Sequence, residues 1–399
     1  MTAEERTDDD ADPPLATDVV LVSFGELGTK SSEVRGKMTD RLRDNVAALL
    51  ADRGVEATVE RTWARLVVHT PDPEWAARIA ADAMGVVWAR PAVGGPADHD
   101  AIGDTLAGLA RDAPPVDTYA VRARRVGDDD AHDFSSRDLE REGGRIVGAV
   151  TDASVDLDDP DRTYHVEVRG DRAHVAAESV AGPGGLPVGT QAPLVALVSG
   201  GHDSPVAAYE AMRRGAPIRP VYVDLGAYGG PDHEARAAAT VDRLASYVPN
   251  VDCRLRIVPG GDVVDRLVTE VGETRMLSWR RALLRIGEVV AERTDAAGVV
   301  TGEAIGQKSS QTVRNLAVTD AAVDCPVHRP LLTRDKADIV EQARAIGTDE
   351  DSSIPAGCER LAPSTPATGT TLDAVEAAEP DDLLDRAAAA VDDLWIADG

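Results

Sequence analysis

One short segment restricts the fold of this chain more than any other, and it runs from Leu197 to Pro205 with the sequence LVSGGHDSP. The apolar stretch 193–198 leads into it and the helix-like stretch 204–214 follows, so it is predicted to form the turn between a buried strand and a helix. Glycines let the backbone approach a phosphate closely, and the N–H groups of a helix start bind one. Because the loop has no lysine, it differs from the Walker loop used for γ-phosphate transfer.

The segments after this turn continue to alternate between strand and helix patterns. We predict strands at 218–225, 254–258 and 298–301, and helices at 235–247 and 278–294. Such alternation predicts an α/β fold with a doubly wound parallel sheet. Ligands of these sheets bind outside the carboxyl ends of the strands, so the end of the second strand is expected near a nucleotide base.

The first half of the chain shows a different pattern, with two small α+β modules. The first follows a β-α-β-β-α order that suggests a ferredoxin-like module, with elements at 19–22, 32–50, 58–60, 65–69 and 73–84. The glycine- and proline-rich stretch 91–96 is interpreted as a linker. The second module is predicted to contain elements at 118–124, 135–151, 164–169 and 173–177, followed by a hinge at 182–189.

The composition restricts the setting in which the chain works. Its formal charge is −28, and only four of its 42 basic residues are lysines. The acidic residues are spread along the chain, which favours adaptation to a cytosol rich in potassium salt; a specific acidic patch for a basic partner is the alternative. No apolar run approaches the roughly 20 residues that cross a bilayer. The N-terminus has no signal-peptide character, so we expect a cytoplasmic protein without membrane contact.

Three motifs together resemble the tRNA 4-thiouridine synthase family of tRNA sulfurtransferases. They are SGGHDSPVA at 199–207, TGEAIGQKSSQT at 301–312 and RPLLTRDK at 329–336, supported by FGELGTKS at 24–31 and GPGGLPVGT at 182–190. The resemblance implies an enzyme that adenylates the C4 oxygen of uridine-8 in tRNA with ATP and Mg²⁺. Sulfur from a persulfide then replaces that oxygen to give 4-thiouridine, and AMP and pyrophosphate are released.

The resemblance also implies names for the parts of the chain. The catalytic part is expected to be a PP-loop ATP pyrophosphatase domain, and the module before it a THUMP RNA-binding domain. The predicted division is a disordered acidic tail at 1–17, the ferredoxin-like domain at 18–95, THUMP at 96–181, a linker at 182–192, the PP-loop domain at 193–372 and a helical tail at 373–399.

The nucleotide site is predicted from the chemistry of the loop residues and from the family resemblance. In the loop, Gly200 and Gly201 allow close approach, Ser199 and Ser204 add hydroxyl donors, and Asp203 is expected to orient the site or help hold Mg²⁺. The resemblance adds ATP contacts at Leu197, Val198, Tyr222, Val223, Gly302 and Gln311. It also suggests that Arg280 or Arg281 neutralises phosphate charge.

Basic residues that could contact tRNA are clustered in two places. Lys30 and Lys37 follow the 24–31 motif, while Arg122, Arg124 and Arg125 end a predicted strand. Arginine can pair with phosphate and stack on exposed bases. Ordinary solvated surface is the alternative for each cluster.

The three cysteines have no metal-like spacing, so we expect no resident metal site. By the resemblance, Cys358 is the candidate catalytic thiol, and the nearby Arg360 would lower its pKa. Cys253 is interpreted as packing, and Cys325 is either a buried residue or a second, resolving thiol. The chain ends about 40 residues after Cys358, so we expect no rhodanese-like domain of the kind that supplies a persulfide in some relatives.

Several alternatives stay open. The sulfur donor could be free sulfide, a persulfide carrier protein or a cluster on the three cysteines, and a homodimer is one alternative for the oligomeric state. A role in thiazole synthesis is not inferred. Two other functions compete: an adenylating ligase for a carboxylate or amide, and a nucleotide-sensing RNA-binding protein without turnover. The RNA-binding modules argue against the first, and the intact loop with Cys358 argues against the second.

Overall fold

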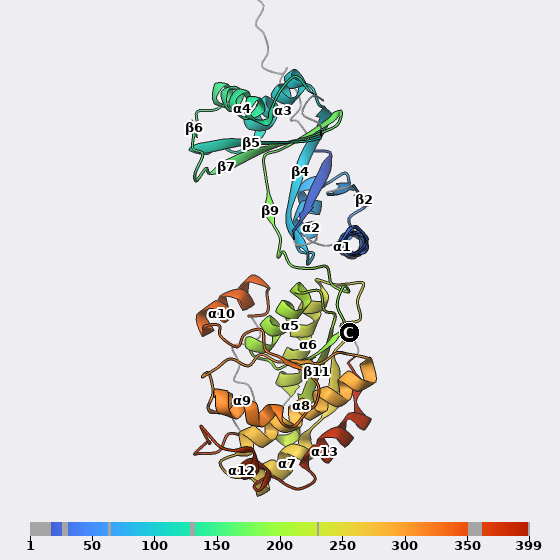
Figure 1. Ribbon diagram of the computed structural model, residues 1–399, viewed down its shortest axis with the longest axis vertical. Helices are drawn as coiled ribbons and strands as arrows, with labels where there is room; N and C mark the ends of the chain where they lie inside the picture. Colours follow the sequence, from blue (N-terminus) through green and yellow to red (C-terminus); the bar gives the residue numbers. More distant parts are fainter. Residues whose placement is uncertain are drawn as a thin grey trace, which may run out of the picture. The chain divides into compact units, whose positions relative to one another are not determined.

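The computed structural model describes residues 17–25, 31–62, 65–127, 132–229, 231–349 and 361–397 (Figure 1). Its contacts divide the chain into two compact units. The first contains Met1–Gly25 and Leu50–Pro183, and the second contains Glu26–Leu49 and Gly184–Gly399. No helix among the described residues is long and apolar enough to cross a membrane.

The first unit is built on a nine-stranded sheet with the order β2-β3-β1-β4-β8-β7-β5-β6, to which β9 adds beside β4. The strands are β1 (Val19–Phe24), β2 (Thr58–Arg61), β3 (Leu66–His69), β4 (Val86–Pro96), β5 (Thr118–Val126), β6 (Ser154–Val155), β7 (Arg162–Arg169), β8 (Arg172–Ala176) and β9 (Val180–Ala181). The helices of this unit are α2 (Pro73–Ala81), α3 (His99–Asp112) and α4 (Ser136–Val150). The sequence analysis missed α3.

Strand β4 corrects the prediction of a linker at 91–96. This segment is the second half of one continuous strand, whose first half pairs with β1 and whose last residues, from Val93 to Pro96, pair with β8. Between the β9 partner Ala89 and the β8 partner Val93, the strand is paired on one side only, which accommodates Pro91 and its missing N–H. Glycine and proline here therefore belong to a sheet and not to a hinge.

Local sequence signals explain where the helices of this unit begin. The side chain of Asp72 accepts a hydrogen bond from the N–H of Trp75, and Pro73 occupies the first turn of α2. At α4, Ser135 and Asp138 form a reciprocal capping box. The predicted helix over 135–151 is therefore confirmed within one residue at each end.

The second unit contains a six-stranded sheet with the order β14-β13-β10-β11-β12-β15. Strands β10 (Leu194–Leu197), β11 (Ile218–Asp224), β12 (Arg256–Pro259), β13 (Val299–Val300) and β14 (Val327–His328) are parallel, and only β15 (Trp395–Ile396) runs antiparallel. The predicted doubly wound parallel sheet is confirmed.

Helices surround this sheet. They are α5 (Asp203–Arg213), α6 (Pro231–Ala245), α7 (Gly261–Glu270), α8 (Arg275–Thr294), α9 (Val313–Asp320), α10 (Lys336–Ala345), α12 (Leu372–Glu376) and α13 (Leu383–Ala389). Most of α1 (Ser32–Asp52) also belongs to this unit, where the buried amide of Asn45 donates to the carbonyl of Val188 at 3.0 Å and accepts from Asn250 at 3.1 Å.

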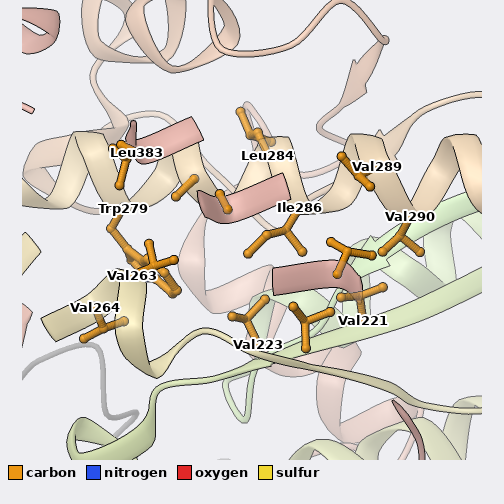
Figure 2. Close-up of a cluster of buried hydrophobic side chains, with 14 of the residues drawn as sticks. Val221, Val223, Val263, Val264, Trp279, Leu284, Ile286, Val289, Val290 and Leu383 are labelled. Atoms are coloured by element: carbon orange, nitrogen blue, oxygen red, sulfur yellow. The ribbon is translucent and has the colours of Figure 1, made fainter. Parts of the chain in front are cut away.

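The core of this unit lies between α8 and the sheet. Trp279, Ile286 and Val290 of α8 pack with Val221 and Val223 of β11 (Figure 2). The C-terminal tail joins the same cluster through Leu383, Ala387 and Val391, and Leu361, which precedes the tail, packs there as well. The tail, for which the sequence predicted only helical character, is therefore part of the core of the second unit, and β15 extends its sheet.

This integration gives a testable prediction. Leu383 is 2% exposed, so Leu383→Ala should leave a cavity and lower the free energy of unfolding by about 2–5 kcal/mol, measured by urea denaturation. Leu157→Ala is the control, because that side chain is 57% exposed and its truncation should cost less than about 0.5 kcal/mol. Equal effects of the two substitutions would contradict a core role for the tail.

Candidate active site

A cavity of about 360 Å³ opens at the carboxyl ends of β10, β11 and β13. Its walls contain most of the predicted nucleotide contacts, namely Leu197, Val198, Ser199, Gly200, Gly201, Asp203, Ser204, Tyr222, Val223, Arg280, Gly302 and Gln311. One side is apolar, with Trp279 and Leu283 of α8 facing the end of β11. The parallel sheet and α8 thus bring together four stretches that are far apart in sequence, at 197–204, 222–223, 279–283 and 302–311.

The glycine loop is held in shape by one of its own side chains and by an arginine of α6. The hydroxyl of Ser204 accepts a hydrogen bond from the N–H of Ser199 at 2.9 Å and donates to the Ser199 carbonyl at 3.1 Å. Arg236 donates to the carbonyl of Gly200. Helix α5 begins directly afterwards at Asp203, so the N–H groups of its first turn are available to an anion.

Gly302, at the end of β13, packs against this loop so closely that a side chain has no room. A Cβ at this position would lie 2.5 Å from the Asp203 carbonyl carbon and 2.7 Å from the Ser204 nitrogen. Both are backbone atoms, which cannot move without displacing the helix start. The glycine is therefore required for the strand end and the loop to line one cavity.

Asp203 has a partner that the sequence analysis did not select as a site residue. Its carboxylate lies 2.6 Å from the ammonium of Lys336, the first residue of α10. Both residues line the cavity. The RPLLTRDK motif contains Lys336 and could have suggested it as a site residue. The motif does not show, however, that the Lys336 side chain points toward Asp203. The adjacent His202 contacts Asp349 at 2.7 Å, so the loop is bonded to the α10 region at two points.

Arg280 is fixed at the cavity wall by a buried carboxylate. It donates to Glu303 and, at 2.9 Å, to the hydroxyl of Ser310. Arg329 binds the same carboxylate at 2.7 Å. Burial by itself would raise the pKa of Glu303, but Arg280 and Arg329 together outweigh burial and hold that pKa below its usual range. Glu303 is therefore an ionised anchor, which the sequence analysis also missed.

Arg281 points elsewhere. Its side chain is 2% exposed and lies 3.0 Å from Glu379 and 3.1 Å from Glu376, both in the C-terminal tail. It also donates to the carbonyl of Val318 at 3.1 Å. Of the two arginines suggested for phosphate, only Arg280 lines the cavity, because neighbouring residues of a helix point about 100° apart.

The cysteines differ in their surroundings. Burial raises the pKa of the Cys253 thiol to about 12, which agrees with a packing role. Burial also raises the pKa of Cys325, with a further contribution from Glu288. Cys325 precedes β14, at the amino ends of the parallel strands, whereas the cavity lies at their carboxyl ends. Neither the distance of Cys325 from the cavity end of the sheet nor its raised thiol pKa favours a role for Cys325 as a resolving thiol. Cys358 lies outside the described residues.

A second, basic cavity of about 370 Å³ lies on the sheet of the first unit. It contains the predicted RNA contacts Arg122 and Arg124, together with residues that the sequence analysis did not select: Arg65, Arg90, Trp88, His165 and His174. Trp88 and Arg90 lie on β4, His165 on β7 and His174 on β8, and Arg65 directly precedes β3, so the group as a whole is not visible in the sequence. The guanidinium groups of Arg90 and Arg65 lie 3.7 and 4.9 Å from the Trp88 ring centre.

The charges in this cavity are strongly coupled. Burial lowers the pKa of Arg90 to about 10, and Arg65 adds to the effect. Burial, Arg90 and Arg122 lower the pKa of His165 to about 4, so this histidine is neutral near pH 7. An anion placed here would relieve the repulsion between these arginines.

The other predicted RNA contacts are not part of this cavity. Arg125 donates to the carbonyls of His132 and Phe134, at 3.3 and 2.9 Å, and so holds its own loop. Lys37 is exposed on α1 and pairs with Glu33 at 2.7 Å. Lys30 lies outside the described residues.

A glycine loop between a parallel strand and a helix, with no Walker lysine and with cations around a nucleotide-sized cavity, defines a PP-loop nucleotide-binding domain. Comparison with known families agrees: residues 189–383 match the thiamine biosynthesis protein (ThiI) family, 19–89 its ferredoxin-like domain and 97–178 the THUMP domain. The chain belongs to the tRNA sulfurtransferase family, as the following relatives show.

A probable tRNA sulfurtransferase of Halobacterium salinarum is 54% identical over 95% of this chain and 97% of its own length. One from Methanosarcina acetivorans is 36% identical over 87% and 85%. Among solved structures, a 4-thiouridine synthetase in complex with RNA and bound ATP matches with a TM-score of 0.81 and 27% identity, over 96% of this chain and 99% of that one. The predicted family and fold class are confirmed.

The contact at Gly302 can be tested by adding one methyl group. Gly302→Ala should weaken ATP binding at least about tenfold, because the loop and the start of α5 must shift to avoid the overlap. The measurement is the dissociation constant for ATP by calorimetry. Gly272→Ala is the matched control, since its Cβ would meet no atom within 4 Å. Unchanged affinity in Gly302→Ala would show that the loop does not bind the nucleotide.

Proposed function

We propose that this chain adenylates the C4 oxygen of uridine-8 in tRNA and replaces it with sulfur to give 4-thiouridine, releasing AMP and pyrophosphate. The observation that carries the proposal is the cavity that places the glycine loop, Lys336 and Arg280 around one space of nucleotide size. The solved relative that contains both RNA and ATP supports the same pair of substrates.

The two sides of the cavity suit the two ends of ATP. Tyr222, Val223, Trp279 and Leu283 offer an apolar surface for the adenine ring. The loop and the start of α5 offer N–H donors for the phosphates, and Lys336 and Arg280 supply positive charge. Adenine binds at the ends of the strands, as in other open α/β sheets.

The reaction needs two substitutions. The uridine O4 attacks the α-phosphorus of ATP, the bond to the β-phosphate oxygen breaks, and pyrophosphate leaves. A sulfur nucleophile then attacks C4, and the C4–O bond breaks so that AMP leaves with the former uridine oxygen. If the nucleophile is a persulfide, a second thiol, proposed to be Cys358, attacks the carrier sulfur of the S–S bond, which leaves 4-thiouridine and a disulfide between Cys358 and the carrier. The first two steps develop negative charge on phosphate oxygens, which fixed cations and N–H groups stabilise without reorganising. Lys336, held by Asp203, is placed for this role.

The residues present fit a magnesium–nucleotide complex better than a resident metal centre. Among the described residues, no group of three or more His, Cys, Asp or Glu side chains could hold a metal ion. The carboxylates that line the cavity are Asp203 and Glu303, and two arginines already hold Glu303. Mg²⁺ commonly uses one carboxylate plus substrate phosphates, so Asp203 is its proposed protein ligand. Bound there, it would neutralise phosphate charge.

The basic cavity of the first unit is the proposed contact for tRNA backbone. Arg122, Arg124 and Arg90 would bind phosphates, and Trp88 and the arginine planes offer surfaces for a base. We retain the proposed division into ferredoxin-like (18–95), THUMP (96–181) and PP-loop (193–372) domains. A cytoplasmic setting and a donor that is either sulfide or a persulfide carrier complete the proposal.

The first test is direct. Unmodified tRNA is incubated in high KCl with the protein, Mg-ATP and sulfide, and its nucleosides are analysed by mass spectrometry. ATP-dependent 4-thiouridine is expected, and Asp203→Ala should abolish both it and AMP formation, because the mutation frees Lys336 and removes the proposed Mg²⁺ ligand. Pyrophosphate release without 4-thiouridine would mean that the donor is missing. If neither product forms although a persulfide carrier is supplied, the proposed thiolation reaction is excluded.

The role of Cys358 is tested by separating the two half-reactions. Cys358→Ser should still adenylate tRNA, seen as release of pyrophosphate in the first turnover at the wild-type rate, but lose persulfide-dependent 4-thiouridine at least about a hundredfold. Cys325→Ser is the matched control and should retain both activities, because that thiol is at the amino ends of the strands. Wild-type turnover by Cys358→Ser with a persulfide donor would remove this residue from the mechanism.

A further inference from the structure

The segment 305–314, part of which lines the nucleotide cavity, also carries exposed aliphatic and cationic side chains. We call Ile305, Lys308, Val313 and Arg314 the rim; they lie on the loop after β13 and on the first turn of α9. Ile305 is 44% exposed and Val313 is 66% exposed, although both are aliphatic. Lys308 is exposed and also lines the cavity, so the rim meets the nucleotide site at this residue.

The two cations of the rim form no ion pair with a carboxylate of the described residues. Neither Lys308 nor Arg314 has an ion pair or side-chain hydrogen bond with any residue that the structure describes. The other described lysines are paired, Lys37 with Glu33 and Lys336 with Asp203. In a chain with a net charge of −28, free cations beside a reaction cavity provide local attraction for a polyanion.

The backbone beneath the rim is held firmly. The N–H of Gly306 donates to the Gln311 carbonyl at 3.1 Å, and the N–H of Gln311 donates to the Lys308 carbonyl at 2.9 Å. The N–H of Ile305 reaches the Leu332 carbonyl at 3.0 Å. Gly306 adopts a positive φ of 80°, which permits this tight turn. The rim side chains are therefore presented from a fixed base, as a binding surface requires.

The side-chain amide of Gln307, next to Lys308, also indicates that this part of the chain binds a ligand. Gln307 lines the cavity, and its amide nitrogen is buried without an acceptor among the described residues. A buried donor without a partner costs about 1–3 kcal/mol, so an acceptor supplied by a ligand would be favoured. A uracil ring carries two carbonyl oxygens that can accept such a hydrogen bond.

We propose that the rim binds the RNA strand that carries the target uridine. Lys308 and Arg314 pair with phosphates on the two sides of this nucleotide, Ile305 and Val313 pack against its ribose or a neighbouring base, and Gln307 donates to a uracil carbonyl. The proposal rests on the proposed function. The uridine O4 must reach the α-phosphate inside the cavity, so the nucleotide has to leave its stack and enter past the rim.

The test compares RNA binding and ATP use in two variants of the full chain. Lys308→Gln/Arg314→Gln should raise the dissociation constant for an unmodified tRNA transcript about tenfold, measured by fluorescence anisotropy, and reduce its salt slope by about 2. Gln307→Leu should lower kcat/KM for tRNA about tenfold. In both variants KM for ATP should change less than the tRNA parameter does, because none of the three residues is a proposed phosphate contact of ATP.

Arg254→Gln is the control for loss of charge, since Arg254 precedes β12 at the opposite end of the strands and is 65% exposed. It should bind tRNA like the wild type. The inference is overturned if the double variant binds tRNA with unchanged affinity and salt slope, or if KM for ATP rises while tRNA binding does not. Because the binding assay needs no turnover, this failure is distinguishable from failure of the proposed reaction, in which the wild type makes neither AMP nor 4-thiouridine.

Discussion

The close contact between Gly302 and the backbone of Asp203 and Ser204 is the constraint on which the catalytic unit depends. It joins the end of β13 to the start of α5, two segments about a hundred residues apart, and leaves no space for a side chain between them. The loop N–H groups, Lys336 and Arg280 then surround the same cavity. A phosphate bound there meets donors that are already oriented, which is how fixed dipoles stabilise developing charge most effectively.

Ion pairs decide which of the many arginines can serve a substrate. Arg281 forms ion pairs with Glu376 and Glu379, and these pairs hold the C-terminal tail against α8. Arg280, one residue earlier, is anchored by Glu303 but remains in the cavity wall. Lys308 and Arg314 have no such carboxylate partner among the residues that the structure describes, although the chain is strongly acidic.

Much of the fold could be predicted because its local signals agree with its tertiary structure. The strand–loop–helix at 194–213 combines a buried strand, a glycine turn and a helix start within 20 residues, and the structure has all three. The prediction failed at 91–96, where glycine and proline indicated a linker but β4 continues through. Pairing with β1 and then β8 supplies the stabilisation that the local sequence lacks, and no local pattern records such long-range partners.

The sequence by itself determined the family, the parallel α/β architecture and the position of the phosphate loop, because these follow from contiguous motifs and from periodicity. Only the tertiary structure decided which side chains share a site. It selected Arg280 over Arg281, gave Asp203 its partner Lys336, and gathered Arg65, Arg90 and Arg122 from three separate strands or loops into one basic cavity. Side-chain direction depends on helix phase and strand register, and proximity depends on how distant segments pack, so neither can be read from the order of the residues.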